Sequence, residues 1–319
     1  LNKLKNDIPK MYCQGCGSKV SKSTLVEFLS NQKANKELSD AIEIKFNQNK
    51  ILQTIDHIKL FKSFNPYDFG IISYLHSQND ILAAGGSVHS LNVSIGVPFS
   101  KNLVESFYLK FFMRGIQNEC SRDGAIIASG HSFQTEEPAV TIAMNGSKNQ
   151  ISNKSLALEG NLIYLSKPLG TGYLLAAYFQ NSNLLSVSDF EKLNTYLKKG
   201  NSLSAKTGFS CGSQLMTDIS GFGLASHLGD ICQSSSLSAQ IHLNLEMLIN
   251  PKLEILKNFE SSGYKNNYLS SFDSIHIKDD HPFMKVIFDP QTNGPLLMAI
   301  DKEKKNEFEE KFLKDCKSK

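Results

Sequence analysis

The sequence predicts a two-domain α/β protein, and three observations lead to that prediction. The 319 residues are long for a single hydrophobic core, so two domains are the default expectation. Strand-like and helix-like apolar patterns are interleaved along both halves of the chain, although not as a strict strand–helix–strand repeat. The polar, turn-rich segment GSKNQISNKS at 146–155 separates the two halves and predicts the domain boundary.

The N-terminal half begins with a predicted helix and a strand. TLVE at 24–27 has the spacing of a capping box, and apolar residues with helical spacing follow it. KILQTID at 50–56 is typical of a strand, and we expect the strand to end on Asp56. A helix follows over 70–86, where Asp80 lies near the end and away from the centre of an apolar stripe formed by Ile71, Ile72, Leu75 and Leu82.

The rest of this half combines three strands with one long helix. VSIGVP at 93–98 is a predicted strand, and the amphipathic segment 102–120 is a helix that stops at the Asp123-Gly124 turn signal. GAIIASG at 124–130 and AVTIAMNG at 139–146 are predicted strands, each punctuated by glycine.

The C-terminal half contains four more predicted strands, at 161–166, 238–248, 284–290 and 296–300. GYLLAAYF at 172–179 opens a helix, and the glycine-rich motif MTDISGFGLASHLGDIC stands at 216–232. The tail 301–319 is a predicted amphipathic helix with Phe308, Phe312 and Cys316 spaced four residues apart.

Composition excludes several classes of protein. Hydrophobic residues make up 40% and charged residues 20% of the chain, which is typical of a soluble globular protein. The net charge of +3 is too balanced for a dedicated nucleic-acid binder, and no apolar run approaches the ~18 residues of a membrane span. The N-terminus lacks a secretory signal, so we expect a cytoplasmic protein. Because the chain begins at Leu1, we expect it to be a piece of a longer protein.

Two cysteines, Cys13 and Cys16, lie close together in MYCQGCGSKV at 11–20. A ribbon-type zinc site needs a second pair about 15–20 residues further on, and none follows. A redox dithiol and a nucleophile beside the cation of Lys19 both remain open, since a nearby cation lowers a cysteine pKa. We expect the other four cysteines to be small buried apolar side chains: Cys120, Cys211, Cys232 and Cys316.

Four aspartates stand at boundaries between apolar elements and loops: Asp40, Asp56, Asp80 and Asp218. A single aspartate at such a boundary is ordinarily a cap or turn residue. Gathered together, the four would suit more than one Mg²⁺ ion on a polyphosphate, because Mg²⁺ takes one or two carboxylates plus phosphate oxygens and water. Neither a GxGxxG turn nor a GxxxxGK[ST] phosphate loop occurs in the sequence.

Seven stretches, in order over nearly the whole chain, resemble the selenophosphate synthetase (selenide, water dikinase) family of the aminoimidazole ribonucleotide synthetase-like superfamily. They are GCGSKV, QTIDHIKLF, NPYDFGIISYLHSQNDILAAGGSVHSLNVSIGVP, ASGHSFQTEEPAVTIAMNG, LIYLSKPLGTG, TDISGFGLASHLGDIC and FDPQTNGPLL. The CQGCGSK form, with its extra upstream cysteine, is most similar to versions fused behind a flavin-dependent dehydrogenase module.

The resemblance implies synthesis of selenophosphate from selenide, ATP and water, with release of AMP and orthophosphate. Matched position by position, it implies a catalytic Cys16, a catalytic and nucleotide-binding Lys19, and Mg²⁺ ligands at Asp40, Asp80 and Asp218. Nucleotide contacts are implied at Asp56, at Asp80 and at the turn Gly130-His131-Ser132.

The implied fold is a homodimer of two-domain α/β chains that associate through their N-terminal sheets. A mobile segment 1–22 carries the cysteine and lysine, an ATP-binding domain spans 23–150, and a C-terminal domain spans 151–319. The tail ends where relatives usually continue into a final strand pair, so we expect a truncated C-terminal domain.

Some positions depart from the family pattern. Ser129 replaces the first glycine of the expected GGH[ST] turn, and Pro295 replaces a glycine in DPQTNGPLL, where proline removes a backbone donor. Two alternatives therefore stay open. One is another ATP-using enzyme of the superfamily, such as a small-molecule kinase, and the other is a catalytically impaired or redox-regulated module with a Cys13–Cys16 disulfide. The GCGSK segment favours selenophosphate synthesis over the sibling enzymes.

Overall fold

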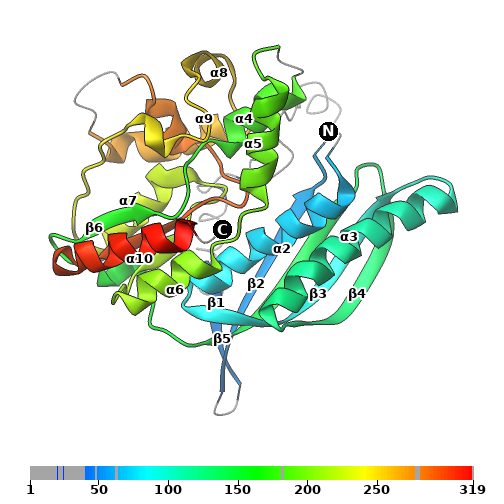
Figure 1. Ribbon diagram of the computed structural model, residues 1–319, viewed down its shortest axis with the longest axis horizontal. Coiled ribbons are helices and arrows are strands. Elements are labelled where there is room, and N and C mark those ends of the chain that lie inside the picture. Colours follow the sequence, from blue (N-terminus) through cyan, green and yellow to red (C-terminus); the bar gives the residue numbers. More distant parts are fainter. Residues whose placement is uncertain are drawn as a thin grey trace.

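The structure, a computed structural model, describes residues 20, 24, 40–46, 49–61, 64–180, 183–276 and 281–317. It contains a five-stranded sheet of order β1-β2-β5-β3-β4 and a three-stranded sheet of order β6-β8-β7. Helices cover both sheets, which confirms the predicted mixed α/β class (Figure 1). The predicted helix after residue 24 and the segment with Cys13, Cys16 and Lys19 lie outside the described residues, except that Thr24 is helical.

The five-stranded sheet is built from the N-terminal half of the chain. Its strands are β1 (Ile42–Phe46), β2 (Asn49–Lys59), β3 (Gly86–Pro98), β4 (Ile126–Thr135) and β5 (Ala139–Lys148). β3 and β4 run parallel, and the other neighbouring strands are antiparallel. β2 continues beyond Asp56 because its ladder with β5 extends to Lys59 opposite Ala139, so the predicted strand end at Asp56 is wrong.

Two helices, α2 (Pro66–Ala83) and α3 (Asn102–Asp123), cover one face of this sheet. They approach each other closely at Gly70 and Gly115, where a Cβ atom would lie 2.3 Å from the carbonyl oxygen of Phe112 and 2.1 Å from that of Tyr67. Only glycine allows backbones to come so near. α3 ends at Gly124, which adopts a left-handed φ of 67°, as the Asp123-Gly124 turn signal predicts.

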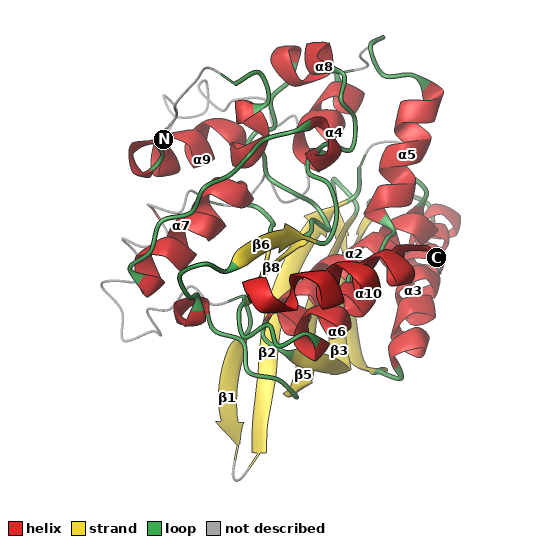
Figure 2. Cartoon of the chain, turned by 60° about the vertical axis from the view of Figure 1, so that its left-hand side comes forward, coloured by secondary structure: helices red, strands yellow, loops and turns green. Residues whose placement is uncertain are grey.

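α2 is the central element of the molecule. Asn65 caps its first turn by accepting a hydrogen bond from the Tyr67 amide at 2.8 Å, and Pro66 occupies the first helical position. One side of α2 packs on the five-stranded sheet, and the helix also contacts β7 from the C-terminal half. Figure 2 shows α6 of that half beside α2. Several polar residues of α2, including His76, Gln78 and Asn79, are consequently as buried as its apolar ones.

The three-stranded sheet comprises β6 (Leu162–Leu165), β7 (Met216–Asp218) and β8 (Leu296–Ile300). The helices around it are α4 (Thr171–Phe179), α5 (Val187–Leu197), α6 (Ser202–Ser210), α7 (Gly223–Ser235), α8 (Leu253–Asn258), α9 (Tyr264–Ser271) and α10 (Lys305–Lys317). The C-terminal half also contains short 3₁₀ turns: η3 (Lys154–Leu156), η4 (Leu245–Met247), η5 (Phe272–Ser274), η6 (Met284–Phe288) and η7 (Lys302–Lys304). The predicted tail helix is confirmed as α10, with Phe308 fully buried and Phe312 partly buried.

Two predicted strands in this half are wrong. Residues 238–248 have strand-like alternation, but in the structure their only strand-type contact is a single bridge between Leu248 and Leu169. Residues 284–288 form η6, which packs under α7 and α9 with Phe288 against the ring of Tyr268. Alternation of apolar residues predicts a strand, but a ladder requires a neighbouring edge with free hydrogen-bonding groups.

Candidate functional site

Asp56 and Asp80 meet where β2 packs against α2. Thr54 and Asp56 lie two residues apart on β2 and therefore share a face, while His76 and Asp80 lie one turn apart on α2. The Thr54 hydroxyl donates a hydrogen bond to Asp80 Oδ2 at 2.5 Å, and His76 Nε2 lies 3.8 Å from Asp56 Oδ1. Each of these two predicted carboxylates thus faces the other's element, Asp80 through Thr54 on β2 and Asp56 through His76 on α2.

Asp40 pairs with Lys154 and contacts Thr217, the residue before Asp218. Asp40 Oδ1 accepts a hydrogen bond from Lys154 Nζ at 2.9 Å, and Asp40 Oδ2 accepts one from the Thr217 hydroxyl at 2.7 Å. Asp218 follows Thr217 at the end of β7 and is buried. Burial lowers the pKa of Lys154, but the charges of Asp40, Asp218 and Asp230 outweigh it and hold that pKa above its ordinary value.

Asp40 connects these two sets of contacts. It stands two residues before Ile42, the first residue of β1, whose ladder partner on β2 is Gln53. Asp40 is therefore placed beside the stretch of β2 that carries Thr54 and Asp56, while its carboxylate contacts Thr217 on β7. The four aspartates line the region where the first sheet, α2 and the second sheet meet.

This donor set fits Mg²⁺ held jointly by protein and phosphate. In the part of the chain that the structure describes, no three acidic or histidine side chains converge closely enough to form a protein-only metal site. Mg²⁺ does not need one, because it is commonly bound through one or two carboxylates with substrate phosphates and water. The partly or fully buried carboxylates of Asp40, Asp56, Asp80 and Asp218 supply more negative charge than Lys154 neutralises.

Three buried asparagines, which no sequence pattern singled out, position His76 of this site. Asn79 on α2 donates to Asn293 Oδ1 at 3.0 Å and accepts from Asn201 Nδ2 at 2.9 Å, and all three side chains are fully buried. Asn293, which adopts a left-handed φ of 44°, donates its backbone N–H to His76 Nδ1 at 3.2 Å. Neutral His76 therefore carries its proton on Nε2, the atom that faces Asp56. The available sequence signal was a run of polar residues, SQND, inside an apolar helix.

The FDPQT motif supports a helix. Asp289 Oδ2 accepts from the amides of Gly172 and Tyr173 at 2.9 and 3.2 Å, and Gln291 Oε1 accepts from those of Gly170 and Thr171 at 2.8 and 3.1 Å. These acceptors satisfy the free N–H groups at the start of α4, so that helix end is not available to a phosphate. Burial raises the pKa of Asp289 to about 7, although the hydrogen bonds that its carboxylate accepts favour the ionised form and lower this pKa.

Gly172 is required by this close contact. A Cβ atom at Gly172 would lie 2.4 Å from Asp289 Oδ1 and 2.5 Å from the carbonyl oxygen of Pro290. The glycine of GTG in the sequence therefore serves the packing of α4 against the 289–291 segment.

Pro295 does not disturb the site. β8 begins at Leu296, so the N–H that proline lacks belongs to no ladder pair of that strand. The Pro295 carbonyl oxygen accepts a hydrogen bond from the Ile219 amide at 2.8 Å. The expectation that this substitution impairs the protein therefore finds no support in the backbone.

Gly130, His131 and Ser132 do not form the predicted turn. They lie inside β4, paired with Val93–Ile95 of β3, because the parallel ladder continues to Thr135. β4 is an edge strand, three positions from β2 in the sheet, so about 14 Å separates the two at ordinary strand spacing. One chain alone thus does not bring His131 to the aspartates.

The cysteines that the structure describes agree with their predicted packing role. Cys120 and Cys211 are buried, and Cys232 is half-buried. Burial raises the thiol pKa of both Cys120 and Cys232, which disfavours the reactive thiolate. The side chain of Cys316 lies outside the described residues, as do Cys13, Cys16 and Lys19, so their roles stay predictions.

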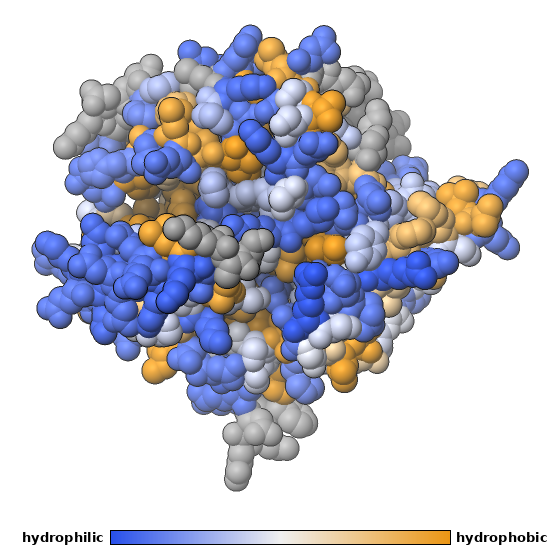
Figure 3. Space-filling view, viewed as in Figure 1, coloured by the Kyte–Doolittle hydropathy of each residue, from blue (hydrophilic) through white to orange (hydrophobic). Residues whose placement is uncertain are grey.

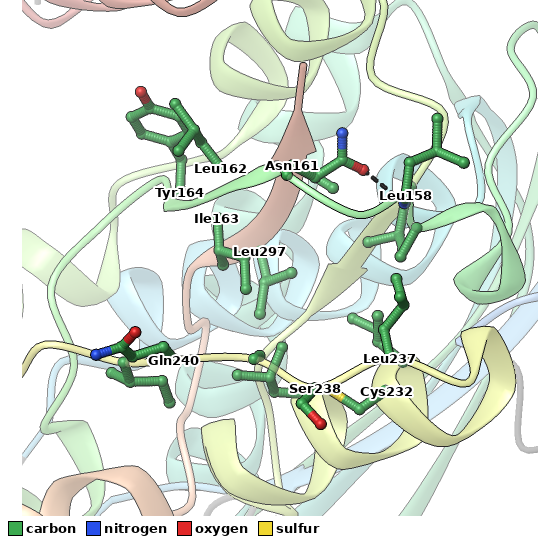
Figure 4. Close-up of a pocket in the computed structure, with 18 of the residues that line it drawn as sticks. Leu158, Asn161, Leu162, Ile163, Tyr164, Cys232, Leu237, Ser238, Gln240 and Leu297 are labelled. Carbon is green, nitrogen blue, oxygen red and sulfur yellow. Dashed lines mark hydrogen bonds between the residues drawn. The ribbon is translucent and has the colours of Figure 1, made fainter. Parts of the chain in front are cut away.

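A separate apolar pocket of about 810 Å³ lies in the C-terminal half. Figure 4 shows it between β6 and the segment through Leu237 and Gln240, with Cys232 of α7 on the same side as that segment. At the margin of the pocket, the Tyr164 hydroxyl donates a hydrogen bond to Glu309 Oε1 of α10 at 2.9 Å. Figure 3 shows an apolar hollow next to polar residues on this face of the molecule. None of the four aspartates lines the pocket, and its leucine and isoleucine walls suit an apolar group rather than a triphosphate.

Both halves of the chain match a known protein family. The family model described as AIR synthase related protein, N-terminal domain, matches residues 38–147, and the corresponding C-terminal domain matches 159–317. A protein of Shewanella sp. (strain MR-7) named selenide, water dikinase is 30% identical over 303 residues, which cover 91% of this chain and 84% of that protein.

Solved structures show the same fold at lower identity. Thiamine monophosphate kinase from Aquifex aeolicus has a TM-score of 0.63 and 17% identity, with 88% of each chain covered. Hydrogenase maturation protein HypE in complex with ATP has a TM-score of 0.55 and 17% identity, covering 92% of this chain and 82% of that one. Across the described ranges, the structure contains no helix with the length and apolarity to cross a membrane.

Proposed function

Because this chain belongs to the AIR synthase related protein family, we propose that it makes selenophosphate from selenide, ATP and water, releasing AMP and orthophosphate. The homologue that is 30% identical carries the name of that activity, and the related fold of HypE has been solved with ATP. The observation that supports the proposal is the placement of Asp40, Asp56, Asp80 and Asp218 on β2, α2, β7 and the residues before β1, which contact one another through Thr54, His76 and Thr217.

The aspartates suit the triphosphate of ATP only when cations accompany it. Carboxylates and phosphates repel each other, so we propose that Asp40, Asp80 and Asp218 hold more than one Mg²⁺ ion, which would neutralise the transferring phosphoryl groups. The Thr54 hydroxyl orients Asp80, and the Nε2 proton of His76 faces Asp56, which we propose contacts the nucleotide. Phosphoryl transfer depends mainly on such positioning and charge neutralisation.

Phosphorus NMR tests the reaction directly. The protein is incubated anaerobically with ATP, Mg²⁺ and selenide, and a selenophosphate resonance should appear together with AMP. ATP consumption that does not respond to selenide would instead identify a small-molecule kinase type of enzyme. Intact ATP under all conditions, with nucleotide still bound, would identify an impaired or redox-regulated module.

Cys16→Ala is expected to abolish selenide-dependent product while leaving nucleotide affinity unchanged. We propose that the Cys16 thiolate guides selenide and that Lys19 adds positive charge beside the triphosphate. Product is measured by phosphorus NMR and nucleotide affinity by calorimetry. Cys13→Ala serves as the matched control and should keep most of the activity. Equal loss in both variants would favour a Cys13–Cys16 dithiol instead.

We further propose a homodimer that forms through the five-stranded sheet, within a chain divided into segment 1–22 and domains 23–150 and 151–319. The sheet face away from α2 and α3 exposes apolar side chains, and Ile55 on β2 is 68% exposed and Phe133 on β4 is 41% exposed. A second copy packed on this face would cover these apolar side chains.

Ile55→Glu is therefore expected to convert the dimer to a monomer, because it places a charge in the proposed interface. Light scattering after size-exclusion chromatography measures the mass. Val187→Glu, at an exposed position on α5, is the control and should leave the mass unchanged. A wild-type protein that elutes as a monomer would contradict this part of the proposal.

The CQGCGSK form also leads us to propose a cytoplasmic protein with a fused or associated flavin-dependent dehydrogenase module. Purification of the natural protein from its own cells should then yield flavin absorbance in the same fraction. Elution without flavin would count against this partner and leave the catalytic proposal untouched.

A further inference from the structure

Lys154 places a cation among the aspartates. It begins the short turn η3, and its ammonium lies 2.9 Å from Asp40 Oδ1, with the side chain only 19% exposed. The charges of Asp218 and Asp230 act on the same ammonium. The region that we propose for divalent cations therefore already contains one positive charge, supplied by the chain itself.

The backbone around Lys154 is fastened to the C-terminal half at several points. The Ser152 hydroxyl accepts from the Met216 amide at 3.1 Å, and the Asn153 amide donates to the Gln214 carbonyl oxygen at 3.0 Å. The Lys154 carbonyl oxygen accepts from the Ser235 hydroxyl at the end of α7, also at 3.0 Å. These bonds fix the backbone from which the Lys154 side chain reaches Asp40, so the placement of the ammonium follows from the fold.

Asp40 has both carboxylate oxygens engaged. Lys154 occupies one oxygen and the Thr217 hydroxyl occupies the other. A divalent cation that approaches Asp40 would meet the ammonium at short range, and two cations on one carboxylate repel each other.

We propose that Lys154 is a tethered counter-ion, which neutralises Asp40 and Asp218 in the metal-free protein and which a divalent cation displaces on binding. The inference rests on the proposed function for the role of Asp40 and Asp218 as metal ligands. Because the ion and the ammonium compete for the same carboxylates, removing the ammonium strengthens ion binding. The displaced ammonium is then free to face the phosphates of a bound nucleotide.

The test compares Lys154→Met with Lys198→Met. Lys198 is a good control because its ammonium also lies 2.9 Å from a carboxylate, Asp68, outside the aspartate site, and both variants lose one positive charge. Free Mn²⁺ is counted by electron paramagnetic resonance during titration of each full-length protein in the absence of nucleotide. Lys154→Met should bind Mn²⁺ about tenfold more tightly than wild type, whereas Lys198→Met should match wild type.

A second measurement needs no variant and covers the case in which Lys154→Met fails to fold. Wild-type protein is treated with an acetylating reagent, with and without saturating Mg²⁺, and the modified lysines are mapped by mass spectrometry. Acetylation of Lys154 should rise several-fold when Mg²⁺ is present, while that of Lys198 should not change.

Two results would overturn the inference: Mn²⁺ affinity in Lys154→Met equal to or weaker than wild type, or Lys154 equally protected at saturating Mg²⁺. Either result leaves selenophosphate synthesis untouched, because the phosphorus NMR assay measures that reaction independently. A wild-type protein that binds no Mn²⁺ and forms no selenophosphate would instead refute the proposed function on which the inference rests.

Discussion

Asp80→Asn is expected to lower the rate of ATP consumption by roughly 10²–10³-fold, the scale of removing one preorganised electrostatic contact in a transition state. Asparagine preserves the shape of the side chain and can still accept the hydrogen bond from Thr54, but it lacks the negative charge that would hold Mg²⁺ on the triphosphate. The rate is measured as AMP formation with selenide present, at saturating Mg²⁺ and ATP.

Asp68→Asn provides the matched control on the same helix. Asp68 lies in the first turn of α2, where its carboxylate contacts Lys198 and Asn194 and takes no part in the aspartate site. Its replacement should leave the rate within about twofold of wild type, because the change is confined to a partly exposed ion pair. An Asp80→Asn enzyme with the rate of the Asp68→Asn control would remove Asp80 from the catalytic proposal.

Asp289→Ala is expected to lower the free energy of unfolding by about 3–5 kcal/mol, because it leaves several buried donors without an acceptor. The amides of Gly172 and Tyr173, the Gln291 side chain and the Ser261 hydroxyl all donate to this carboxyl group. Urea unfolding monitored by circular dichroism gives the change.

The control for this effect is Asp301→Ala. Asp301 also precedes a helical turn, η7, but it is exposed, and its side chain accepts a long hydrogen bond of 3.4 Å from Asn161. Its replacement should cost about 0.5 kcal/mol or less, as surface changes usually do. If Asp289→Ala were no more destabilising than Asp301→Ala, the FDPQT motif would need a role other than holding α4.

Local patterns were sufficient for elements whose own residues determine them. The Asp123-Gly124 signal predicted the end of α3, and the spacing of Phe308 and Phe312 predicted the buried face of α10. The same kind of reasoning failed for residues 238–248 and 284–290, because a strand exists only where another strand offers its edge. Whether such an edge is available depends on residues far away in the sequence, so the apolar pattern within the segment does not reveal it.

The candidate site divides in the same way. Asp40, Asp56, Asp80 and Asp218 were identified from the sequence, because ionisable residues at the ends of apolar segments are visible in any one chain. Lys154, Thr54 and the asparagine network were not, since each acts through a partner from a distant segment. No role for FDPQT was predicted for the same reason, because the start of α4, which it caps, lies more than a hundred residues earlier.

The sequence by itself determined the α/β class and the family and singled out the four candidate aspartates, because residue type, local spacing and the order of motifs are properties of the chain alone. Only the tertiary structure decided that Asp40 pairs with Lys154, that His131 lies on an exposed edge strand, and that Asp289 and Gln291 hold a helix. The physical reason is that burial and partnership decide what a charged or polar group does, and both are set by packing between distant segments.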